Sequence, residues 1–278
     1  MGLPRFLVDR LEEQGTLRLC ESESHHASRV LRLGSGDRCV VFDGQGHEAD
    51  GTIQSVEKRS VEVSYRSCTF APRDHEDRLH FAIGMPKGDR QRSVIEKLVE
   101  LGVDRLTPID TERSVSKFDA DAIEKLKRYA IEACKQSQRN RLMHIDPSIG
   151  WKEWLARSVQ GEPSSLWMLH PQTLHEAGVS GVRFIRSDRW LAEDPLGAES
   201  RVGSKSRVVF AVGPEGGFTA GEVAQAIEYG VGLLDLGERI LRVETAVSAA
   251  AVLGSLRIGR VESDIAMSEP TSASGWAI

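Results

Sequence analysis

The residues best suited to chemistry lie in two short segments in the last third of the sequence. Residues 213–218 read Gly-Pro-Glu-Gly-Gly-Phe, and residues 236–246 read Leu-Gly-Glu-Arg-Ile-Leu-Arg-Val-Glu-Thr-Ala. Glycines allow positive φ angles and close approach of a ligand, and Pro214 fixes one φ angle. The first segment matches neither a GxGxxG dinucleotide loop nor a P-loop, so phosphate binding is not supported there. A ligand loop is favoured, and a tight turn without a ligand is the alternative.

The second segment brings two opposite charges to the start of an expected helix. Arg242 and Glu244 are two residues apart, and a carboxylate near a helix start is favoured by the helix dipole. The two side chains could therefore simply pair, and their types alone leave a catalytic role open.

Alternating strands and helices are expected to position these segments. Strands are expected at residues 79–84, 105–109, 166–169, 208–212 and 233–236, and helices at 92–101, 121–138, 220–229 and 244–258. This alternation predicts an α/β domain with a mainly parallel sheet. Both segments follow strands, and the carboxyl ends of such strands are where these sheets bind ligands.

Before residue 78, several short segments alternate apolar and polar residues as strands do, which predicts a small β-rich module. Strands are expected at residues 5–8, 38–42, 51–56 and 60–65, with a short helix at 25–33, and a small barrel is the natural packing. Residues 71–77 are interpreted as a linker, residues 187–207 as a long surface loop and residues 261–278 as a disordered tail. The expected domains are therefore residues 1–73 and 78–260, followed by the tail.

Composition and charge narrow the class of protein. The chain has 278 residues with a net charge of −5, which argues against a protein that coats nucleic acid non-specifically. Residues 125–141 nevertheless carry six basic residues against one acidic residue, so they form either a solvated helix face or an RNA-contacting patch. No apolar run is long enough for a membrane span, no signal peptide is recognisable, and the four cysteines lack zinc-site spacing. A cytoplasmic protein without a metal or a membrane anchor is expected.

The two segments closely resemble motifs of the SPOUT methyltransferases, and specifically of the RsmE family, which methylates N3 of a uridine in 16S ribosomal RNA. Residues 25–37 are similar to the amino-terminal PUA-like barrel of that family, and residues 96–103 and 111–114 match its central segments. Residues 132–139 correspond to a further motif, in which Lys135 replaces an acidic residue of the family. The resemblance covers roughly residues 3–258.

The resemblance implies an α/β fold with a C-terminal SPOUT (trefoil-knot) methyltransferase domain and an N-terminal PUA-like β-barrel that binds RNA. It also implies S-adenosyl-L-methionine as the cofactor, 16S rRNA of the small ribosomal subunit as the partner, and a homodimer with the active site near the subunit interface. The implied cofactor pocket is lined by backbone and apolar groups of Leu169, Gly213, Pro214, Glu215, Gly217, Leu236, Gly237, Ile240, Leu241, Thr245 and Ala246.

Two catalytic residues and two groups of RNA-binding residues follow from the same resemblance. Arg242 would stabilise the charge on the uracil ring as the N3 proton leaves, and Glu244 would orient Arg242 or accept the proton. Residues expected to hold RNA or the target base, from the other subunit, are Arg113, Gln136 and Arg139. An RNA-facing patch on the barrel is expected from Arg5, His25, His26, Arg29 and Arg32, with surface or capping roles as the alternative for the two histidines.

Two other functions remain open. One is a SPOUT methyltransferase that acts on tRNA or another rRNA site. The other is a catalytically inactive knotted RNA-binding factor for ribosome assembly, against which the intact glycine loop argues.

Overall fold

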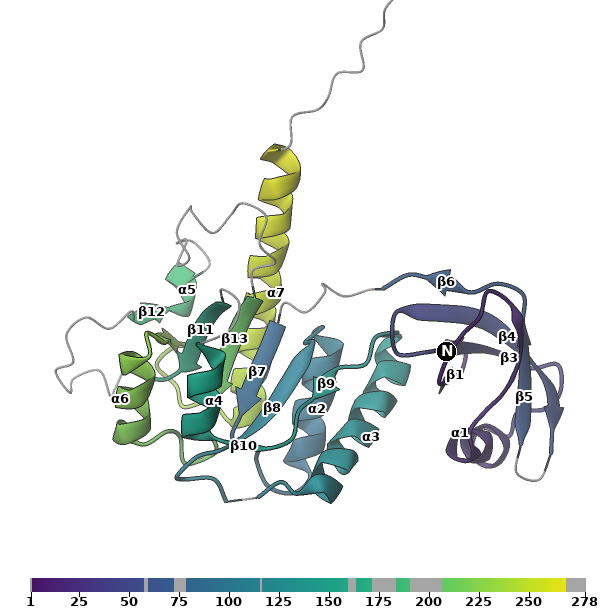
Figure 1. Ribbon diagram of the computed structural model, residues 1–278, viewed down its shortest axis with the longest axis horizontal. Coiled ribbons are helices and arrows are strands. Elements are labelled where there is room, and N and C mark those ends of the chain that lie inside the picture. The colour runs from purple at the N-terminus through teal and green to yellow at the C-terminus, as the bar shows by residue number, and fades with distance from the viewer. Residues whose placement is uncertain are drawn as a thin grey trace, which may run out of the picture. The chain divides into compact units, whose positions relative to one another are not determined.

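The computed structural model describes residues 2–57, 60–72, 79–115, 117–159, 164–171, 184–190 and 207–268. The chain divides into two compact units, one of Met1–Asp74 with Glu124–His144 and the other of His75–Ile123 with Ile145–Ile278. Each unit contains its own sheet and its own apolar core (Figure 1).

The first unit is built on a six-stranded sheet. Its strands lie in the order β1 (Arg5–Leu7), β3 (Arg38–Phe42), β4 (His47–Val56), β5 (Val61–Tyr65) and β2 (Gly15–Arg18), and β6 (Thr69–Phe70) pairs with β4. Only β1 and β3 run parallel, and the other neighbours are antiparallel. The four expected strands are confirmed, but β2 was missed because its burial does not alternate as the pattern requires.

The helical segment of the first unit differs from the expected single helix at residues 25–33. It begins earlier, as α1 (Glu21–His25), and continues as a π-helical turn, η1 (His26–Val30). Arg32 has a φ of 56°, and a right-handed helix cannot continue through a residue in that conformation.

The core of the first unit is formed by alternate residues of its strands. Val41, Ile53, Val61 and Val63 are fully buried, and they pack in one cluster with Phe6. This period of two is the property that made the strands predictable from the sequence.

Most of α3 (Ala120–Ser137), from Glu124 onward, and the residues after it complete the first unit. Lys135 Nζ lies 2.6 Å from Glu23 Oε1 of α1, and both side chains are less than 10% exposed. Asn140 Nδ2 donates hydrogen bonds to the carbonyl oxygens of Gly46, at 3.2 Å, and Ala71, at 2.9 Å.

A parallel sheet forms the centre of the second unit. Its strands follow the order β10 (Ile149–Gly150), β8 (Arg105–Asp110), β7 (Leu79–Ile83), β13 (Arg207–Val212), β11 (Ser164–Leu169), β14 (Gly232–Asp235) and β12 (Phe184–Arg186), and β9 (His144–Ile145) pairs with β8. The neighbours in that order all run parallel. The five expected strands are confirmed, whereas β9, β10 and β12 are too short to show a period.

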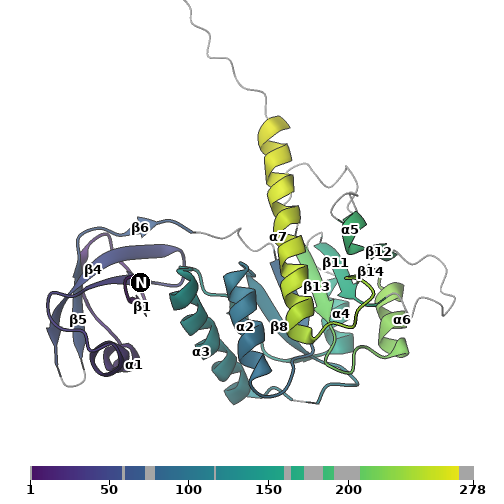
Figure 2. The same ribbon diagram turned by 180° about the vertical axis from the view of Figure 1, so that it is seen from behind.

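Helices cover both faces of this sheet, as Figures 1 and 2 show from opposite sides. On one face lie α2 (Arg90–Glu100) and α7 (Val243–Ser268), and on the other lie α4 (Trp151–Ser158) and α6 (Ala220–Glu228). Gly254 lets α7 approach closely, because a Cβ there would lie 2.6 Å from Leu79 Cδ1. The sequence predicted α2, α3, α6 and α7 but not the short helix α4.

Two expectations about irregular segments are corrected. α7 does not end before residue 261 but continues to Ser268, since the next helix-breaking proline is Pro270. The expected surface loop at 187–207 begins with a helical turn, α5 (Ser187–Trp190), because Trp190 buries its ring against Trp167 and Phe210. Residues 191–206 and 269–278, and residues 73–77 of the expected linker, lie outside the described residues.

Candidate active site

Three loops leave the same edge of the parallel sheet. β11 pairs with β13 on one side and with β14 on the other, and all three strands run in the same direction. The residues that follow them are His170, Gly213 and Leu236, so the sheet brings both chemical segments together with Leu169 between them. The carboxyl edge of a parallel sheet is where such folds bind ligands.

The loop after β13 is a tight turn that glycine favours. Gly217 has a φ of 68°, and its N–H donates a hydrogen bond to the Pro214 carbonyl oxygen at 2.8 Å. A Cβ on Gly213 would lie 3.1 Å from the Gly217 backbone, whereas a Cβ on Gly217 would meet no atom within 4 Å. The turn is therefore compact on one side and open on the other.

Arg113 holds this turn from the segment after β8. Its Nη1 donates to the Gly216 carbonyl oxygen at 2.7 Å, and a Cβ on Gly216 would lie 3.2 Å from the Arg113 side chain. The exposed Arg113 was expected to bind RNA, and the structure gives its guanidinium a partner in the glycine turn.

Glu222 is a second residue that holds the turn, and sequence reasoning missed it. It is 2% exposed and forms a capping box with Thr219 at the start of α6. Its Oε1 also accepts a hydrogen bond from Glu112 N at 2.9 Å. The Thr-x-x-Glu spacing is the signal that could have revealed the cap, but nothing in the sequence reveals the bond to Glu112.

Glu215 lies on the exposed side of the turn and faces the segment before α2. Its Oε1 is 3.5 Å from Arg90 Nη1 and accepts a hydrogen bond from Lys87 N at 3.4 Å. The carboxylate expected in the cofactor pocket is thus engaged by a cation that the sequence did not single out.

The loop after β14 is shaped by Asp235 and Gly237. Asp235 is 3% exposed, and its Oδ1 accepts a hydrogen bond from Gly237 N at 2.9 Å. Gly237 has a φ of 113° with no atom within 4 Å of its Cβ position. Ile240 is 95% exposed, and Leu236 and Leu241 are half-buried. The loop therefore offers apolar surface next to open space.

Arg242 and Glu244 lie at the start of α7. The Arg242 carbonyl oxygen accepts from Thr245 N at 3.0 Å and Ala246 N at 2.9 Å, which begins the helix, while the Arg242 side chain is exposed. Glu244 is half-buried, and its Oε2 is a buried atom with no hydrogen-bond partner among the described residues. Thr245 is exposed and Ala246 half-buried. The site thus combines an exposed cation with an unpartnered carboxylate oxygen.

The residues expected to bind RNA on the first unit divide into buried and exposed groups. Arg5 is 8% exposed, pairs with Glu48 Oε2 at 3.0 Å and lies 5.0 Å from the centre of the Phe42 ring. Arg139 is 4% exposed. Both guanidinium groups are therefore buried within the unit, which corrects the expectation that they face RNA.

The exposed members of that set surround η1. His25, Arg29 and Arg32 are exposed and His26 is half-buried, as is expected of residues around a short surface helix. Val30 is 60% exposed among them. Gln136, on α3, is exposed as well.

Within the part of the chain that the structure describes, no three His, Cys, Asp or Glu side chains are grouped as a metal ion would require. Among the same residues, no helix combines the length and the apolar character of a membrane span.

Comparisons with known proteins agree with this geometry. Residues 73–254 match the model of an RNA methyltransferase domain, and residues 19–64 match that of an RNA methyltransferase PUA domain. The chain is 30% identical over 252 residues to the ribosomal RNA small subunit methyltransferase E of Bacillus subtilis, covering 88% of this chain and 93% of that protein. The Synechocystis protein of the same name is 30% identical over 85% of this chain and 72% of its own length.

Solved structures show the same fold. The ribosomal RNA small subunit methyltransferase E of Neisseria gonorrhoeae, crystallised with S-adenosyl methionine, superposes with a TM-score of 0.74 at 27% identity, covering 90% of this chain and 95% of that one. A Legionella pneumophila methyltransferase with bound SAM gives a TM-score of 0.76 at 26% identity, covering 93% and 98%. The fold is thus α/β, with a C-terminal SPOUT methyltransferase domain after an N-terminal PUA-like domain.

Proposed function

Because the chain belongs to the ribosomal RNA small subunit methyltransferase E family, we propose that it transfers a methyl group from S-adenosylmethionine to N3 of one uridine in 16S rRNA. The observation that carries this proposal is the convergence of the glycine turn, the apolar loop and the Arg242–Glu244 segment at one sheet edge.

The residues of this edge fit an adenosyl cofactor. The Cβ positions of Gly217 and Gly237 face open space, so a ligand can approach the backbone of both loops closely. Ile240, Leu236 and Leu241 offer apolar surface for a flat ring. Beside them, Leu169, Gly213 and Pro214 would complete the pocket, whereas Glu215 would act at its rim through Arg90. When bound, the cofactor supplies an electrophilic methyl group on a sulfonium.

The chain's own residues would prepare uracil N3 for that methyl group. N3 carries a proton that must leave, and the unpartnered Oε2 of Glu244 is an acceptor suited to take it. The exposed guanidinium of Arg242 would stabilise the negative charge that spreads over the ring. The two loops would hold the reacting groups in line, which supplies most of the rate enhancement in a displacement of this kind.

The rRNA would be held by exposed residues of the first unit. On the first unit we propose His25, Arg29 and Arg32 as phosphate contacts, with His26 beside them. Gln136 would contact RNA from α3, and Arg113 would position the glycine turn. We further propose that the enzyme is a cytoplasmic homodimer with its active site near the subunit interface, as the resemblance to its family implies.

Nucleoside mass spectrometry of rRNA and tRNA from cells with and without the gene tests the reaction. Loss of N3-methyluridine from 16S rRNA alone, restored by the wild-type gene and not by the Arg242→Ala variant, is the expected result. Loss of a methylated nucleoside from tRNA instead would identify tRNA, and not 16S rRNA, as the substrate. Unchanged nucleosides together with no binding of S-adenosylmethionine in calorimetry would favour an assembly factor.

A further inference from the structure

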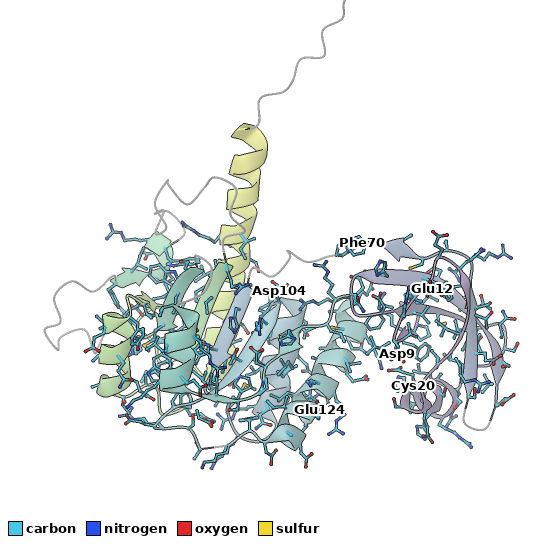
Figure 3. The ribbon with its side chains drawn as sticks, viewed as in Figure 1. Asp9, Glu12, Cys20, Phe70, Asp104 and Glu124 are labelled. Carbon is cyan, nitrogen blue, oxygen red and sulfur yellow. The ribbon has the colours of Figure 1, made fainter. Side chains whose placement is uncertain are left out.

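Two loops that meet at the candidate site follow strands that are not neighbours in the sheet. β7 lies between β8 and β13, so about 10 Å separates these two strands. β8 begins after Asp104, which Figure 3 labels, and ends at Asp110. All three strands run parallel, so the residues after β8 lie at the same edge as the glycine turn, residues 213–218. Strand pairing does not join the two loops, and side chains therefore have to hold one against the other.

The residues after β8 form a closed turn of four residues, from Thr111 to Ser114, which we call the β8 turn. The Ser114 N–H donates a hydrogen bond to the Thr111 carbonyl oxygen at 3.0 Å. The Thr111 N–H donates to the Ser114 hydroxyl oxygen at 2.9 Å. The two central residues of the turn are Glu112 and Arg113. Because the turn is closed by its own hydrogen bonds, a contact that anchors one central residue also sets the position of the other.

Each central residue of the β8 turn makes a connection outside the turn. The Glu112 N–H donates to Glu222 Oε1 of α6 at 2.9 Å. Arg113 Nη1 donates to the carbonyl oxygens of Gly216, at 2.7 Å, and Phe218, at 3.4 Å. The Arg113 side chain is exposed and has many rotamers, whereas the Glu222 side chain belongs to a residue that is 2% exposed. The buried bond to Glu222 therefore places the backbone from which Arg113 reaches the glycine turn.

Capping of α6 does not explain why both oxygens of Glu222 are used. The cap needs only Oε2, which accepts from the Thr219 N–H at 2.8 Å, and a neutral glutamine serves equally in such a cap. A glutamine has one acceptor oxygen, so only a carboxylate can accept from both the Thr219 and the Glu112 N–H groups. Burying a charged group is costly unless it is hydrogen-bonded. The carboxylate at this position is thus explained by its bond to the β8 turn.

We propose that Glu222 is a positioning residue for the cofactor. It fixes the β8 turn, and Arg113 then holds the glycine turn in the conformation that S-adenosylmethionine binds. The inference rests on the proposed function, in which the glycine turn receives that cofactor. A loop that is ordered before its ligand arrives binds more tightly, because less free energy is spent on ordering it. Removal of the Glu222 carboxylate should therefore weaken cofactor binding, and it should do so through Arg113.

Calorimetric titration of the full-length protein with S-adenosylmethionine, in the absence of RNA, tests this role. Glu222→Ala is expected to raise the Kd at least about tenfold, as loss of a hydrogen bond to a charged group does. In a protein that already carries Arg113→Ala, the same substitution should change the Kd by less than about twofold, because effects that act through one group are not additive. A purely structural role of Glu222 would give the same loss in both backgrounds.

Thr219→Ala is the matched control for the cap of α6. It removes the hydroxyl oxygen that accepts from the Glu222 N–H at 3.3 Å and leaves both bonds of the Glu222 carboxylate in place. It should lower the melting temperature, as loss of an N-cap does, while the Kd stays within about twofold of the wild type. Circular dichroism during heating measures the stability of each variant.

Ser114→Ala is the second variant, and it keeps the proposal testable if Glu222→Ala does not fold. It removes the hydroxyl group that closes the β8 turn and leaves α6 unchanged. Since that turn is the part that Glu222 fixes, the Kd should rise about threefold, the usual effect of one neutral hydrogen bond.

The outcomes separate this role from the proposed function. A wild-type protein that does not bind S-adenosylmethionine would contradict the proposed function itself. Binding by the wild type with an unchanged Kd in Glu222→Ala, or in Ser114→Ala where the first variant does not fold, would overturn only the positioning role. An equal loss of affinity with and without Arg113, or a comparable loss in Thr219→Ala, would also overturn it, because Glu222 would then act only by stabilising α6.

Discussion

At the residue scale, Arg242 has two separable functions. Its carbonyl oxygen begins α7, and any residue can supply that oxygen, whereas its exposed guanidinium is specific to arginine. We predict that Arg242→Ala lowers the rate of methyl transfer about 100- to 1,000-fold, as loss of a donor to a developing anion does, and leaves cofactor affinity unchanged. Initial rates on 16S rRNA at saturating cofactor measure the first effect, and calorimetry measures the second. Arg92→Ala, on α2, is the matched control and should retain the full rate.

Glu244 is the acidic residue of the first turn of α7, and its Oε2 has no hydrogen-bond partner among the described residues. If it accepts the N3 proton, Glu244→Gln should lower the rate about 100- to 10,000-fold at neutral pH. Raising the pH should restore part of the rate, because hydroxide can then remove the proton. A pH–rate profile of the variant is the measurement, with Glu228→Gln at the end of α6 as control. A uniform loss at every pH would instead indicate a purely structural role.

Cys39 illustrates how burial lowers the reactivity of a thiol. Burial raises the pKa of the Cys39 thiol from 9.0 to about 11, with a further contribution from the charge of Asp50. Because the thiolate is the reactive form, iodoacetamide at pH 8 should label the exposed Cys20 and spare Cys39. Peptide mass spectrometry measures the labelling, and rapid labelling of native Cys39 would contradict the prediction.

The raised pKa of Cys39 in the folded state also affects the stability of the fold. The contribution of this thiol to stability is complete below pH 9 and is lost as the pH rises toward 11.

At the element scale, the ion pair between α3 and α1 tests what holds the first unit together. Burial opposes protonation of Lys135, but its hydrogen bonds with Glu132 and Glu23 raise the pKa, so the ammonium stays charged at neutral pH. We predict that Lys135→Met destabilises the first unit by about 3 to 5 kcal/mol, because the buried Glu23 carboxylate then has no cation.

The double variant Glu23→Leu/Lys135→Met removes both charges and should recover most of that loss. Urea unfolding followed by circular dichroism measures both variants. A double variant no more stable than Lys135→Met alone would show that the pair contributes through packing rather than charge.

The glycine turn shows which part of the site the sequence predicts. Gly213 and Gly217 identified a loop that a ligand can approach, and the strand before it identified the sheet edge. The residues that hold the turn were not identifiable, because Arg113 lies 103 positions from Gly216, and Glu112 lies 110 from Glu222. Local patterns contain information on φ angles and burial, but not on which distant loops meet.

The same distinction explains the misjudged RNA-binding arginines. Arg5 and Arg139 have the residue type that binds phosphate, but their partners and burial arise from tertiary packing. The continuous apolar run of β13 and the helical period of α3 predicted both elements almost to the residue. The order of strands in the sheet was not predicted, because the local pattern of a parallel sheet permits many orders.

At the scale of the whole molecule, the two units should respond differently to the cofactor. All five tryptophans lie beyond residue 150, so their fluorescence reports on the second unit, whereas the first unit has none. S-adenosylmethionine at 100 times its Kd should add about 2.7 kcal/mol to the stability of the unit that binds it. We predict that the fluorescence transition moves to higher temperature, while a transition of the first unit, followed by circular dichroism, moves less.

Gly217→Val is the variant for this experiment, since a β-branched residue is strained at a φ of 68°. It should abolish the shift with cofactor while the transition of the first unit stays in place. If both transitions move together in the wild type, the units unfold as one, and the prediction is wrong.

The first unit is assembled from two separate stretches of sequence, so it cannot fold completely until the ribosome has synthesised the second stretch. When residue 74 has been polymerised, Glu23 still lacks Lys135, and the carbonyl groups of Gly46 and Ala71 still lack Asn140. At about 5 to 20 residues per second, the segment up to residue 144 follows roughly 4 to 14 s later. The nascent barrel therefore spends seconds without its closing segment, although that segment is made before the remaining 134 residues, which all belong to the second unit.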